Sequence, residues 1–508
     1  MLDVTNFWDL IERRAQLSPD ARMALDETGR VMTFAQYRDD AERAAAGLQR
    51  MGIGSGTVVS WQLPTWLESF VLCAALSRLE AIQNPILPIY REREVGFIAR
   101  QAKTKLLIVP SIWRNFAFEE MARGIARTTD ALEVLVSDKS LPTDDPSTLP
   151  PAPTPTGAEA APVRWLFYTS GTTADPKGAQ HTDYTIAATA KGMSERLALT
   201  EDDRSGVVFP FTHIAGPIWL MSALMTGCTL LIDEAFDPVR TTRFLRDNDV
   251  TLAGSGTIFH MAYLNAQREQ PETPLFPHVR AFPGGGAPKP PQLHFDLVAE
   301  MHAPIVSGYG LTESPILTMA SADDGDEALA NTEGRAMRDV DLRVVTLEGK
   351  VAGIGEEGEI RAKAPQLMRG YLDMALDKDA FDEDGYFRTG DLGKLDADGN
   401  VTITGRLKDI IIRKGENISA KEVEDLLFQH PRVADAAVIG LPDAASGEIA
   451  CAVVALKEGT LTLLEIADFL KEKGLRTQAI PERVEIVPVL PRNPAGKVLK
   501  QDLKKQYA

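Results

Sequence analysis

The first 140 residues alternate between two patterns of apolar positions. Residues 34–51 and 67–79 carry apolar side chains at three- to four-residue spacing, which predicts two helices. The short apolar runs VVSWQL (58–63) and LLIVP (106–110) predict strands. Because helices and strands that follow one another in turn are typical of a parallel sheet covered by helices, this region is expected to be α/β.

The pattern changes twice further along the chain. Residues 141–163 contain seven prolines and no basic residue, which predicts a surface linker. From residue 164 the alternation resumes, with apolar runs in LFYTS, VVFPF, TLLID, TLAGS, VRAFPGGG and IVSGYG. After residue 316, the short strands DLRVVT, GEIRAKA and VTITG stand between Gly and Asp turns, which predicts a small β-rich subdomain or barrel that ends near residue 404. The remaining residues predict a compact α+β unit.

One apolar stretch is long enough to raise the question of a membrane span. Residues 206–232 contain no Asp, Glu, Lys or Arg. Pro210, His213 and Pro217 interrupt the stretch, so a buried strand, loop, helix and second strand are expected instead. The N-terminal segment MLDVTNFWDLIERRAQ lacks a basic start before an apolar run, and it predicts an amphipathic helix rather than a signal peptide. We therefore expect no transmembrane segment.

Composition narrows the class of protein. The 508 residues include 54 Lys+Arg and 72 Asp+Glu, which give a formal net charge of −18. This acidic balance disfavours binding to nucleic acid or to anionic membranes, because both require clustered Lys and Arg. It does not exclude a local basic pocket for an anionic ligand. Cys73, Cys228 and Cys451 form no C-x-x-C pair, so the sequence predicts no disulfide framework or zinc site and favours a cytoplasmic location.

A loop rich in hydroxyl groups follows one predicted strand, in LFYTSGTTADPKG (166–178). The residues that could hold phosphate oxygens through hydroxyls, backbone N–H groups and a countercharge are Thr169, Ser170, Gly171, Thr172, Thr173 and Lys177. The segment departs from the Walker A pattern, because Pro176 and Gly178 stand where a glycine and a Ser/Thr belong. An ordinary Ser/Thr/Gly turn is the alternative interpretation.

The loop sequence YTSGTTADPKG (168–178) resembles the signature of the adenylate-forming (AMP-binding) superfamily, which includes acyl-CoA synthetases, luciferases and nonribosomal-peptide adenylation domains. Further motifs of that family follow in its order: FTHIAG (211–216), GGGAP (284–288), YGLTE (309–313), YFRTGDLG (386–393), GRLKDIIIRKGENIS (405–419) and PRNPAGK (491–497). The resemblance covers nearly the whole chain, and such a series is highly specific.

The resemblance implies an α/β fold with two domains. Residues 1–407 would form a large N-terminal AMP-binding domain of two α/β subdomains and a small β-barrel subdomain. Residues 408–508 would form a mobile α+β lid domain that carries the catalytic lysine, with Lys408 at the hinge. Rotation of the lid would let one site run two half-reactions in sequence.

The resemblance also implies roles for individual residues. The catalytic residues would be His213, Thr312, Glu313 and Lys497. Glu313 would hold Mg²⁺, Thr312 would hydrogen-bond the α-phosphate, and Lys497 would neutralise the charge that builds up there. The residues that would bind ATP and CoA are the phosphate-loop residues named above together with Gly286, Ala287, Pro288, Gly308, Tyr309, Gly310, Asp391, Arg406, Lys414 and Gly415.

Among these residues, Tyr309 would stack on adenine, and Asp391 would accept the ribose hydroxyls with Arg406 nearby. Lys414 and Gly415 belong to the segment that would line the CoA tunnel. Structural interpretations stand beside these roles. Glu313 could be a solvated residue at a helix start, Asp391 could close an Asx turn, and the glycines 284–286 could form a tight turn. His213 could be a core histidine, and Lys497 an ordinary surface lysine.

The expected function is that of an AMP-forming carboxylate–CoA ligase, which joins a small-molecule carboxylic acid to CoA through an acyl-adenylate at the expense of ATP. Pocket walls are expected around His213, Trp219, Thr257, 282–285 and 308–316. No Asp stands beside His213 to pair a substrate ammonium, which disfavours amino acids, and no basic residue in the walls would pair a second carboxylate, which disfavours diacids.

The segments LPTWLESF, PILPIYRE and RKGENISAKEVEDLLFQHP are most similar to those of short- and medium-chain fatty-acid or cyclohexanecarboxylate CoA ligases. A medium-chain or alicyclic acid is therefore expected, with an aryl acid such as benzoate or cinnamate as the alternative. Three rival functions stay open: a ligase that loads a carrier protein, an oxidative or light-emitting use of the adenylate, and a nucleotide-binding scaffold without turnover. The sequence leaves the oligomeric state open, and a homodimer is compatible with it.

Overall fold

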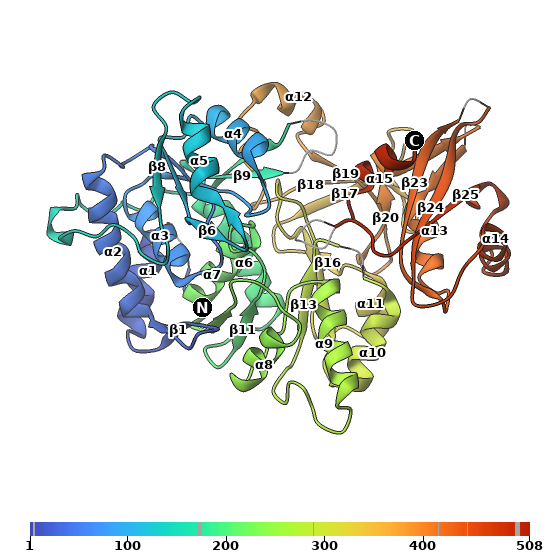
Figure 1. Cartoon of the computed structure of the whole chain (residues 1–508), viewed down its shortest axis with the longest axis horizontal. Coiled ribbons are helices and arrows are strands. Elements are labelled where there is room, and N and C mark those ends of the chain that lie inside the picture. The colour runs from blue at the N-terminus through green and yellow to red at the C-terminus, as the bar shows by residue number, and fades with distance from the viewer. Residues whose placement is uncertain (4–5, 170–174, 288, 415, 444, 493–497) are drawn as a thin grey trace.

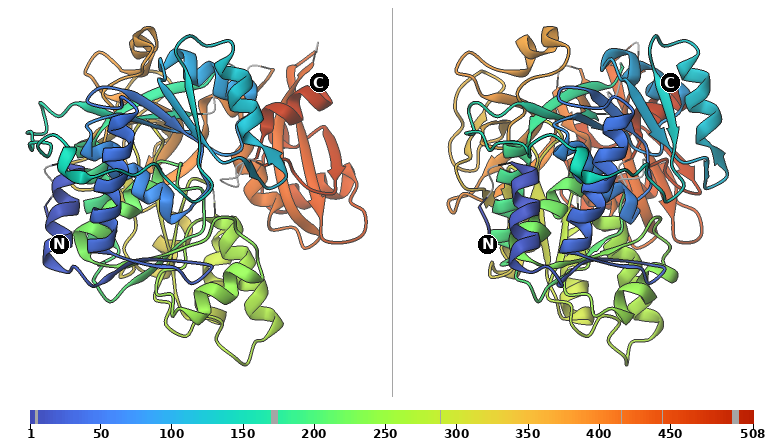
Figure 2. Two further views of the ribbon diagram at one scale, coloured as in Figure 1. Left: turned by 60° about the vertical axis from the view of Figure 1, so that its left-hand side comes forward. Right: turned by 90° about the vertical axis from the view of Figure 1, so that its left-hand side faces the viewer.

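A computed structural model describes the chain except for residues 4–5, 170–174, 288, 415, 444 and 493–497. The N-terminal and central residues form a large body of several sheets and helices, shown from blue to light orange in Figure 1. The last hundred or so residues, shown in orange and red, form a smaller unit at one end of the molecule. Figure 2 shows this unit projecting from the side of the large body.

The largest sheet confirms the α/β prediction for the first part of the chain. Its six strands are, in order, β10 (Lys177–Thr182), β9 (Val163–Thr169), β4 (Ile82–Pro85), β3 (Val58–Trp61), β5 (Leu106–Val109) and β8 (Glu133–Val136). All neighbours are parallel except the edge strand β10, which runs antiparallel to β9. Strand β9 ends at Thr169, and Lys177 pairs with Thr169 at the start of β10, so the chain turns back there.

A second sheet and the helices between the sheets form the main core. Its strands are, in order, β11 (Arg204–Val207), β12 (Thr229–Ile232), β1 (Arg22–Asp26) and β2 (Val31–Thr33). The helices of this region are α1 (Phe7–Leu17), α2 (Phe34–Arg50), α3 (Leu67–Arg78), α6 (Asp183–Arg196) and α7 (Ala215–Thr226). Helix α7 is buried on nearly all sides, as its uniformly apolar sequence requires. Within the described residues, no helix combines the length and apolar character needed to cross a bilayer.

The proline-rich segment 141–163 lies along the surface of this body and is held to it. The carbonyl of Pro150 accepts a hydrogen bond of 2.7 Å from the guanidinium of Arg78. Gly47 on α2 lies so near the carbonyl of Pro142 that a Cβ there would stand 2.3 Å from that oxygen. The predicted linker is therefore an ordered strap across α2 and α3.

A third sheet carries several of the predicted site residues. Its strands are, in order, β13 (Phe282–Gly285), β14 (Ile305–Tyr309), β15 (Thr318–Met319) and β16 (Arg335–Ala336). Helices α9 (Thr257–Glu269), α10 (Pro291–Met301) and α11 (Asp326–Asn331) accompany it, at the lower right of Figure 1. The run TLAGS contributes a single residue, because Leu252 makes one bridge to Ser205 and another to Ala281. That residue links the third sheet to the second.

The fourth sheet differs from the expected barrel. Its strands are, in order, β17 (Asp341–Val345), β18 (Gly358–Lys363), β19 (Phe387–Leu395) and β20 (Val401–Arg406), all antiparallel. Among the described residues, no pairing of β17 with β20 closes the sheet. The free edge of β20 is instead occupied by residues 333–335, since Glu333 N–H donates to Val401 O and Val401 N–H donates to Gly334 O.

The C-terminal unit has its own sheet and its own core. Its strands are, in order, β22 (Glu416–Ser419), β21 (Ile410–Arg413), β24 (Gly447–Leu456) and β23 (Val433–Asp443), and β25 (Arg483–Val487) pairs with β24. The helices are α13 (Ala420–Leu427), α14 (Leu463–Glu472) and α15 (Lys500–Tyr507). Helix α13 and strand β22 contact β20 of the large body, which places the two parts side by side. The predicted α+β character of this unit is confirmed.

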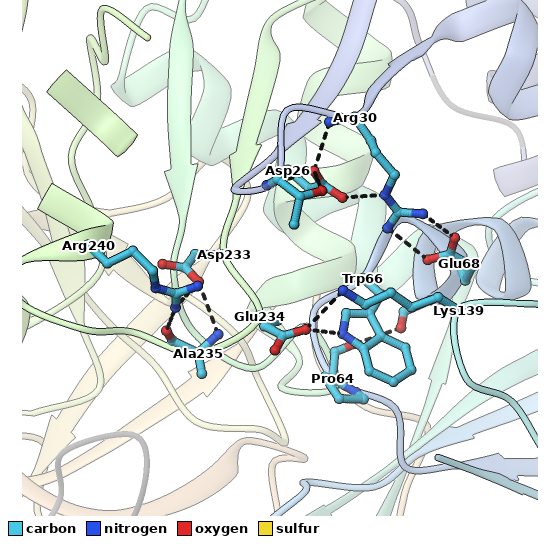
Figure 3. A network of polar contacts seen from close by, with 12 residues as sticks. Asp26, Arg30, Pro64, Trp66, Glu68, Lys139, Asp233, Glu234, Ala235 and Arg240 are labelled. Atoms are coloured by element: carbon cyan, nitrogen blue, oxygen red, sulfur yellow. Dashed lines mark hydrogen bonds and ion pairs between the residues drawn. The ribbon is translucent and has the colours of Figure 1, made fainter. Parts of the chain in front are cut away.

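A network of charged side chains joins the ends of β1 and β12 (Figure 3). Arg30 donates to Asp26 at 2.7 Å and to Glu68 at 2.6 Å, which ties the turn after β1 to the first turn of α3. The indole N–H of Trp66 donates to Glu234, which follows β12. The loop before α3 is thereby fixed, and this loop supports the segment that carries His213.

Candidate active site

A large cleft between the large body and the C-terminal unit collects most of the predicted site residues. Those that line it are Thr169, Lys177, His213, Gly286, Ala287, Gly308, Tyr309, Gly310, Thr312, Glu313, Asp391 and Arg406. Ser170, Gly171, Thr172, Thr173, Pro288, Gly415 and Lys497 lie outside the described residues. Lys414 is described and does not line the cleft.

The sheets explain why these residues meet. Thr169 stands at the carboxyl end of β9, Gly285 at that of β13 and Tyr309 at that of β14. In open α/β sheets, ligands bind in the crevice outside the carboxyl ends of the strands. Lys177 reaches the same place because β10 begins opposite Thr169.

Backbone packing accounts for several glycines among the predicted nucleotide-binding and pocket-wall residues. A Cβ on Gly285 would lie 2.8 Å from Gly308 O, and one on Gly310 would lie 2.2 Å from Ile316 N. These glycines are therefore required by close approach of the chain to itself. Gly286 has φ of 76°, and no atom of the described residues lies within 4 Å of its Cβ position. It is the one of these three that leaves room for a ligand.

Glu313 is largely buried beside Tyr371, a residue that the sequence analysis missed. The hydroxyl of Tyr371 donates to Glu313 Oε1 at 2.7 Å. The ammonium of Lys177 lies 5.4 Å from the centre of the Tyr371 ring, within the range of a cation–π contact. Local sequence gives little indication of the contact between Tyr371 and Glu313, because the two residues are 58 positions apart in the chain.

Asp391 is held by two partners within the cleft. Its Oδ1 accepts from Arg406 Nε at 2.7 Å, and its Oδ2 accepts from the hydroxyl of Tyr309 at 2.8 Å. Burial and the nearby carboxylate raise the pKa of Tyr309, which keeps that hydroxyl protonated and donating. A carboxylate has about four lone-pair sites, so two stay available to hydroxyl groups of a ligand.

His213 lies at the start of α7 with its ring along the cleft wall. Its Nδ1 accepts from Ala215 N–H at 3.2 Å, and burial lowers the pKa of His213 to about 4. The ring is therefore neutral at pH 7. The hydroxyl of Thr65 clamps the preceding segment, because it donates to Phe209 O at 2.9 Å and accepts from Phe211 N–H at 3.0 Å.

The predicted pocket wall is apolar, with two differences from expectation. Trp219, Thr257 and residues 283–285 line the cleft, whereas Phe282 is wholly buried behind it. Lys289 is a basic residue in the cleft wall that the sequence analysis missed. Its ammonium donates to Ser307 Oγ at 2.7 Å and to Thr332 O at 2.8 Å, and it lies 3.7 Å from Glu333 Oε1. Burial lowers the pKa of Lys289, and its charge is already compensated by Glu333.

The C-terminal unit brings further charged groups to the cleft. Lys408 lines it, and burial together with repulsion from Arg406 lowers the pKa of Lys408. Lys414 stands at the tip of the β21–β22 hairpin with φ of 50°, and its N–H donates to Ser446 O at 2.8 Å. The expected contact of Lys414 with CoA in the cleft would therefore require another arrangement of the two parts.

The side chains that could act as metal ligands suit only some modes of metal binding. No group of three or more His, Cys, Asp or Glu side chains within the described part of the chain could enclose a metal ion. Mg²⁺ usually binds through one or two carboxylates plus substrate phosphates and water, rather than in a cage of protein ligands. A single carboxylate such as Glu313, whose partner Tyr371 also contacts Lys177, fits that pattern.

The family comparison agrees with this geometry. The family model for AMP-binding enzymes matches residues 11–372, and the model for their C-terminal domain matches residues 422–497. The chain therefore belongs to the AMP-binding enzyme family, whose named relatives here are AMP-forming acid ligases. Among them, the medium-chain fatty-acid–CoA ligase of Escherichia coli K12 is 31% identical over 99% of this chain and 90% of that protein. The salicyl-AMP ligase/salicyl-S-ArCP synthetase of Mycobacterium tuberculosis H37Rv is 30% identical over 94% of this chain and 85% of that protein.

Solved structures share the whole fold. The structure of ATP-bound MatB from Rhodopseudomonas palustris is 28% identical, covers 98% of this chain and 99% of that chain, and superposes with a TM-score of 0.88. The apo form of the same protein has the same identity and coverage and a TM-score of 0.78. The expected combination of a large α/β body with a small C-terminal domain is thereby confirmed.

Proposed function

We propose that this protein is an AMP-forming carboxylate–CoA ligase. The observation that carries the proposal is the meeting of Lys177, Glu313 and the Asp391–Arg406 pair in one cleft that also has an apolar wall. These groups suit a triphosphate, a metal-bound phosphate and a ribose, while the wall suits an uncharged acyl group. Membership of the AMP-binding enzyme family supports the same assignment.

In the first half-reaction, the substrate carboxylate attacks the α-phosphorus of ATP, and pyrophosphate leaves as acyl-AMP forms. The phosphate loop 169–177 and Lys177 bind the phosphates, Thr312 donates to the α-phosphate, and Asp391 with Arg406 binds the ribose. Lys497 neutralises charge at the α-phosphate. Glu313 would hold Mg²⁺, which would screen the charge of the phosphates. In the second half-reaction the CoA thiol attacks the acyl carbonyl, and AMP leaves.

Two reactions at one cleft call for two arrangements of the C-terminal domain. We place the domain boundary between residues 407 and 408, with Lys408 as the hinge and the loop around Lys414 and Gly415 as the CoA contact of the second arrangement. The higher TM-score with ATP-bound MatB than with its apo form supports the first arrangement for the structure described here. Lys414, outside the cleft in this arrangement, would enter after rotation.

The acid is proposed to be a medium-chain fatty acid or an alicyclic acid. Support comes from the apolar wall around Trp219 and from the pairing of Lys289 with Glu333, which compensates the charge of that lysine. The relative from Escherichia coli carries a medium-chain name. An aryl acid, or transfer to a carrier protein in place of CoA, is the second candidate, since another relative is named for salicylate and for loading a carrier.

The test is carboxylate-dependent release of pyrophosphate, followed by thioester formation with CoA or with a holo-carrier protein. A panel of acids from C6 to C12, cyclohexanecarboxylate, benzoate and cinnamate should give the highest rates with the medium-chain or alicyclic members. Lys497→Ala should lower pyrophosphate release by about 10²- to 10³-fold, because it removes a charge that stabilises the transition state. Lys457→Ala, an exposed lysine of the same domain, is the matched control. Equal release from the wild type and from Lys497→Ala would contradict the mechanism.

A cytoplasmic location and a homodimer remain part of the proposal. The three cysteines are buried and unpaired, which suits a reducing compartment. Light scattering of the purified protein gives the mass in solution directly. A mass of one chain would exclude the dimer under those conditions.

A further inference from the structure

Tyr371 stands between two groups that the proposed function assigns to ATP and its metal. Its side chain is 4% exposed, and its hydroxyl donates to Glu313 Oε1 at 2.7 Å. Its ring lies 5.4 Å from the ammonium of Lys177. Among the described residues, Tyr371 is the one side chain that both donates a hydrogen bond to Glu313 and makes a cation–π contact with Lys177.

The backbone around Tyr371 is held in place by β10. Gln180 N–H donates to Gly370 O at 3.0 Å, and Leu372 N–H donates to Gly178 O at 2.7 Å. The residues 369–372 therefore extend the sheet beyond β10, which begins with Lys177 itself. Tyr371 and Lys177 are thus fixed relative to each other by main-chain hydrogen bonds.

A second set of contacts fixes the other side of the same segment. The N–H of Tyr371 donates to Asp377 Oδ1 at 2.8 Å, and Gly370 adopts φ of 113°, a conformation that favours glycine. The N–H of Met368 donates to Glu313 O at 2.8 Å, so the main chain of Glu313 is tied to this segment as well. The phenol ring has little freedom to move away from the carboxylate.

The hydroxyl of Tyr371 is the donor in its bond with Glu313. A phenol has one O–H to give, and an ionised carboxylate can only accept. A hydrogen bond to an ionised acceptor is stronger than one between neutral groups. With one oxygen of Glu313 engaged in this way, the carboxylate is held in a single orientation, and its other oxygen can face a metal ion.

We propose that Tyr371 is a positioning residue for the Mg²⁺·ATP site, in which its hydroxyl orients Glu313 toward the metal and its ring holds the ammonium of Lys177 beside that carboxylate. The inference rests on the proposed function, because the roles of Glu313 and Lys177 come from it. It adds a residue that couples the phosphate-binding lysine to the metal-binding carboxylate.

Two substitutions separate the two contacts. Tyr371→Phe keeps the ring and removes the hydroxyl, and Tyr371→Leu removes both. Binding of ATP is measured by calorimetry across a series of Mg²⁺ concentrations and in EDTA, with neither acid nor CoA present. For Tyr371→Phe, the Mg²⁺ concentration at half-maximal enhancement of ATP binding should rise about tenfold, since one charged hydrogen bond is lost. ATP affinity in EDTA should stay unchanged in Tyr371→Phe and should fall in Tyr371→Leu.

Steady-state kinetics give a second readout. Tyr371→Phe should raise the KM for Mg²⁺·ATP more than it lowers kcat, and added Mg²⁺ should restore part of the rate. In the double variant Glu313→Gln/Tyr371→Phe, the second change should add nothing to the first, because Tyr371 acts through Glu313. A general loss of structure would not produce a selective dependence on Mg²⁺.

The matched control is Tyr386→Phe. The hydroxyl of Tyr386 also donates to a carboxylate, that of Asp341, and its ring also contacts cations, with Arg343 at 3.8 Å. Tyr386 does not line the cleft, so its variant should titrate with Mg²⁺ like the wild type. A Tyr371→Phe titration identical to that of the wild type would overturn the inference while leaving the ligase assignment intact. ATP binding by the wild type that is independent of Mg²⁺ would overturn the role of Glu313 and this inference together.

Discussion

At the scale of single residues, the site depends on contacts between positions far apart in the chain. His181 is fully buried, and its Nε2 donates to the carbonyl of Thr312 at 2.9 Å. Because a carbonyl can only accept, the neutral ring carries its proton on Nε2. Burial lowers the pKa of His181 to about 4, although the bond to Thr312 acts in the opposite direction.

This buried histidine predicts a pH dependence of stability. An unfolded histidine titrates near pH 6.5, so between about pH 6.5 and 4 the unfolded state binds more protons than the folded state. The free energy of unfolding should therefore fall as the pH falls through this window. The contribution of His181 is present in full above the window, and between pH 7 and 5 it should decline by about 2 kcal/mol.

The comparison that isolates this contribution is urea unfolding of the wild type and of His181→Asn at pH 7, 6 and 5. The advantage of the wild type over the variant should shrink toward pH 5, because the variant has no imidazole to protonate at this position. Parallel curves for the two proteins over the whole range would contradict the assignment.

At the scale of elements, α7 shows how a tight turn sets the position of the cleft wall. The helix begins at Ala215, two residues after His213, and the chain passes close to itself at this point. A Cβ on Gly216 would lie 2.0 Å from Phe211 O, a backbone atom that cannot move without shifting the segment that carries His213. Glycine at this position is therefore a packing requirement.

Gly216→Ala should lower the free energy of unfolding by about 1–3 kcal/mol, the usual cost of overpacking, and should raise the KM for the acid. Gly54→Ala is the matched control, because no atom of the described residues lies within 4 Å of its Cβ position and its φ is not positive. The control should be neutral or slightly stabilising. Chemical unfolding and acid-dependent kinetics measure both quantities, and a Gly216→Ala protein as stable as the control would refute the packing argument.

At the scale of the whole molecule, a small contact joins the large body to the C-terminal unit near the proposed hinge. Ser419 Oγ caps α13 by accepting from Glu422 N–H at 3.3 Å, and it donates to Thr404 O at 2.7 Å across the boundary. The Cβ position of Gly405 lies 3.2 Å from Ser419 Oγ. These two positions are close in the described arrangement, and the proposed rotation should separate them.

The pair Gly405→Cys/Ser419→Cys should therefore form a disulfide that locks this arrangement. The oxidised protein should keep pyrophosphate release and lose thioester formation, because the C-terminal domain can no longer rotate. Reduction should restore the second half-reaction, and the reduced protein serves as its own control. The native cysteines are buried and should not interfere. Thioester formation at an equal rate in both states would contradict rotation about residue 408.

The sequence predicted the individual helices and strands well, but it predicted poorly which strands pair with one another. The helix over Phe34–Arg50 follows from apolar spacing and from a capping box between Thr33 and Gln36. The barrel expected before residue 404 is an open sheet, because residues 333–335 occupy the edge of β20. The run TLAGS makes two isolated bridges instead of a strand, because only Leu252 pairs with the adjacent segments, at Ser205 and at Ala281. Pairing partners depend on distant segments, which local periodicity does not encode.

The sequence by itself determined the family, the order of the motifs and the side chains that bring charge to the cleft, because motif identity and residue type are local properties of the chain. The tertiary structure decided that Tyr371 meets Glu313, that Glu333 compensates Lys289, and that Tyr309 and Arg406 share Asp391. These contacts arise where the ends of separate sheets converge. The strength of each contact depends on the distance between its two partners and on how deeply they are buried. Only the folded chain defines these two quantities.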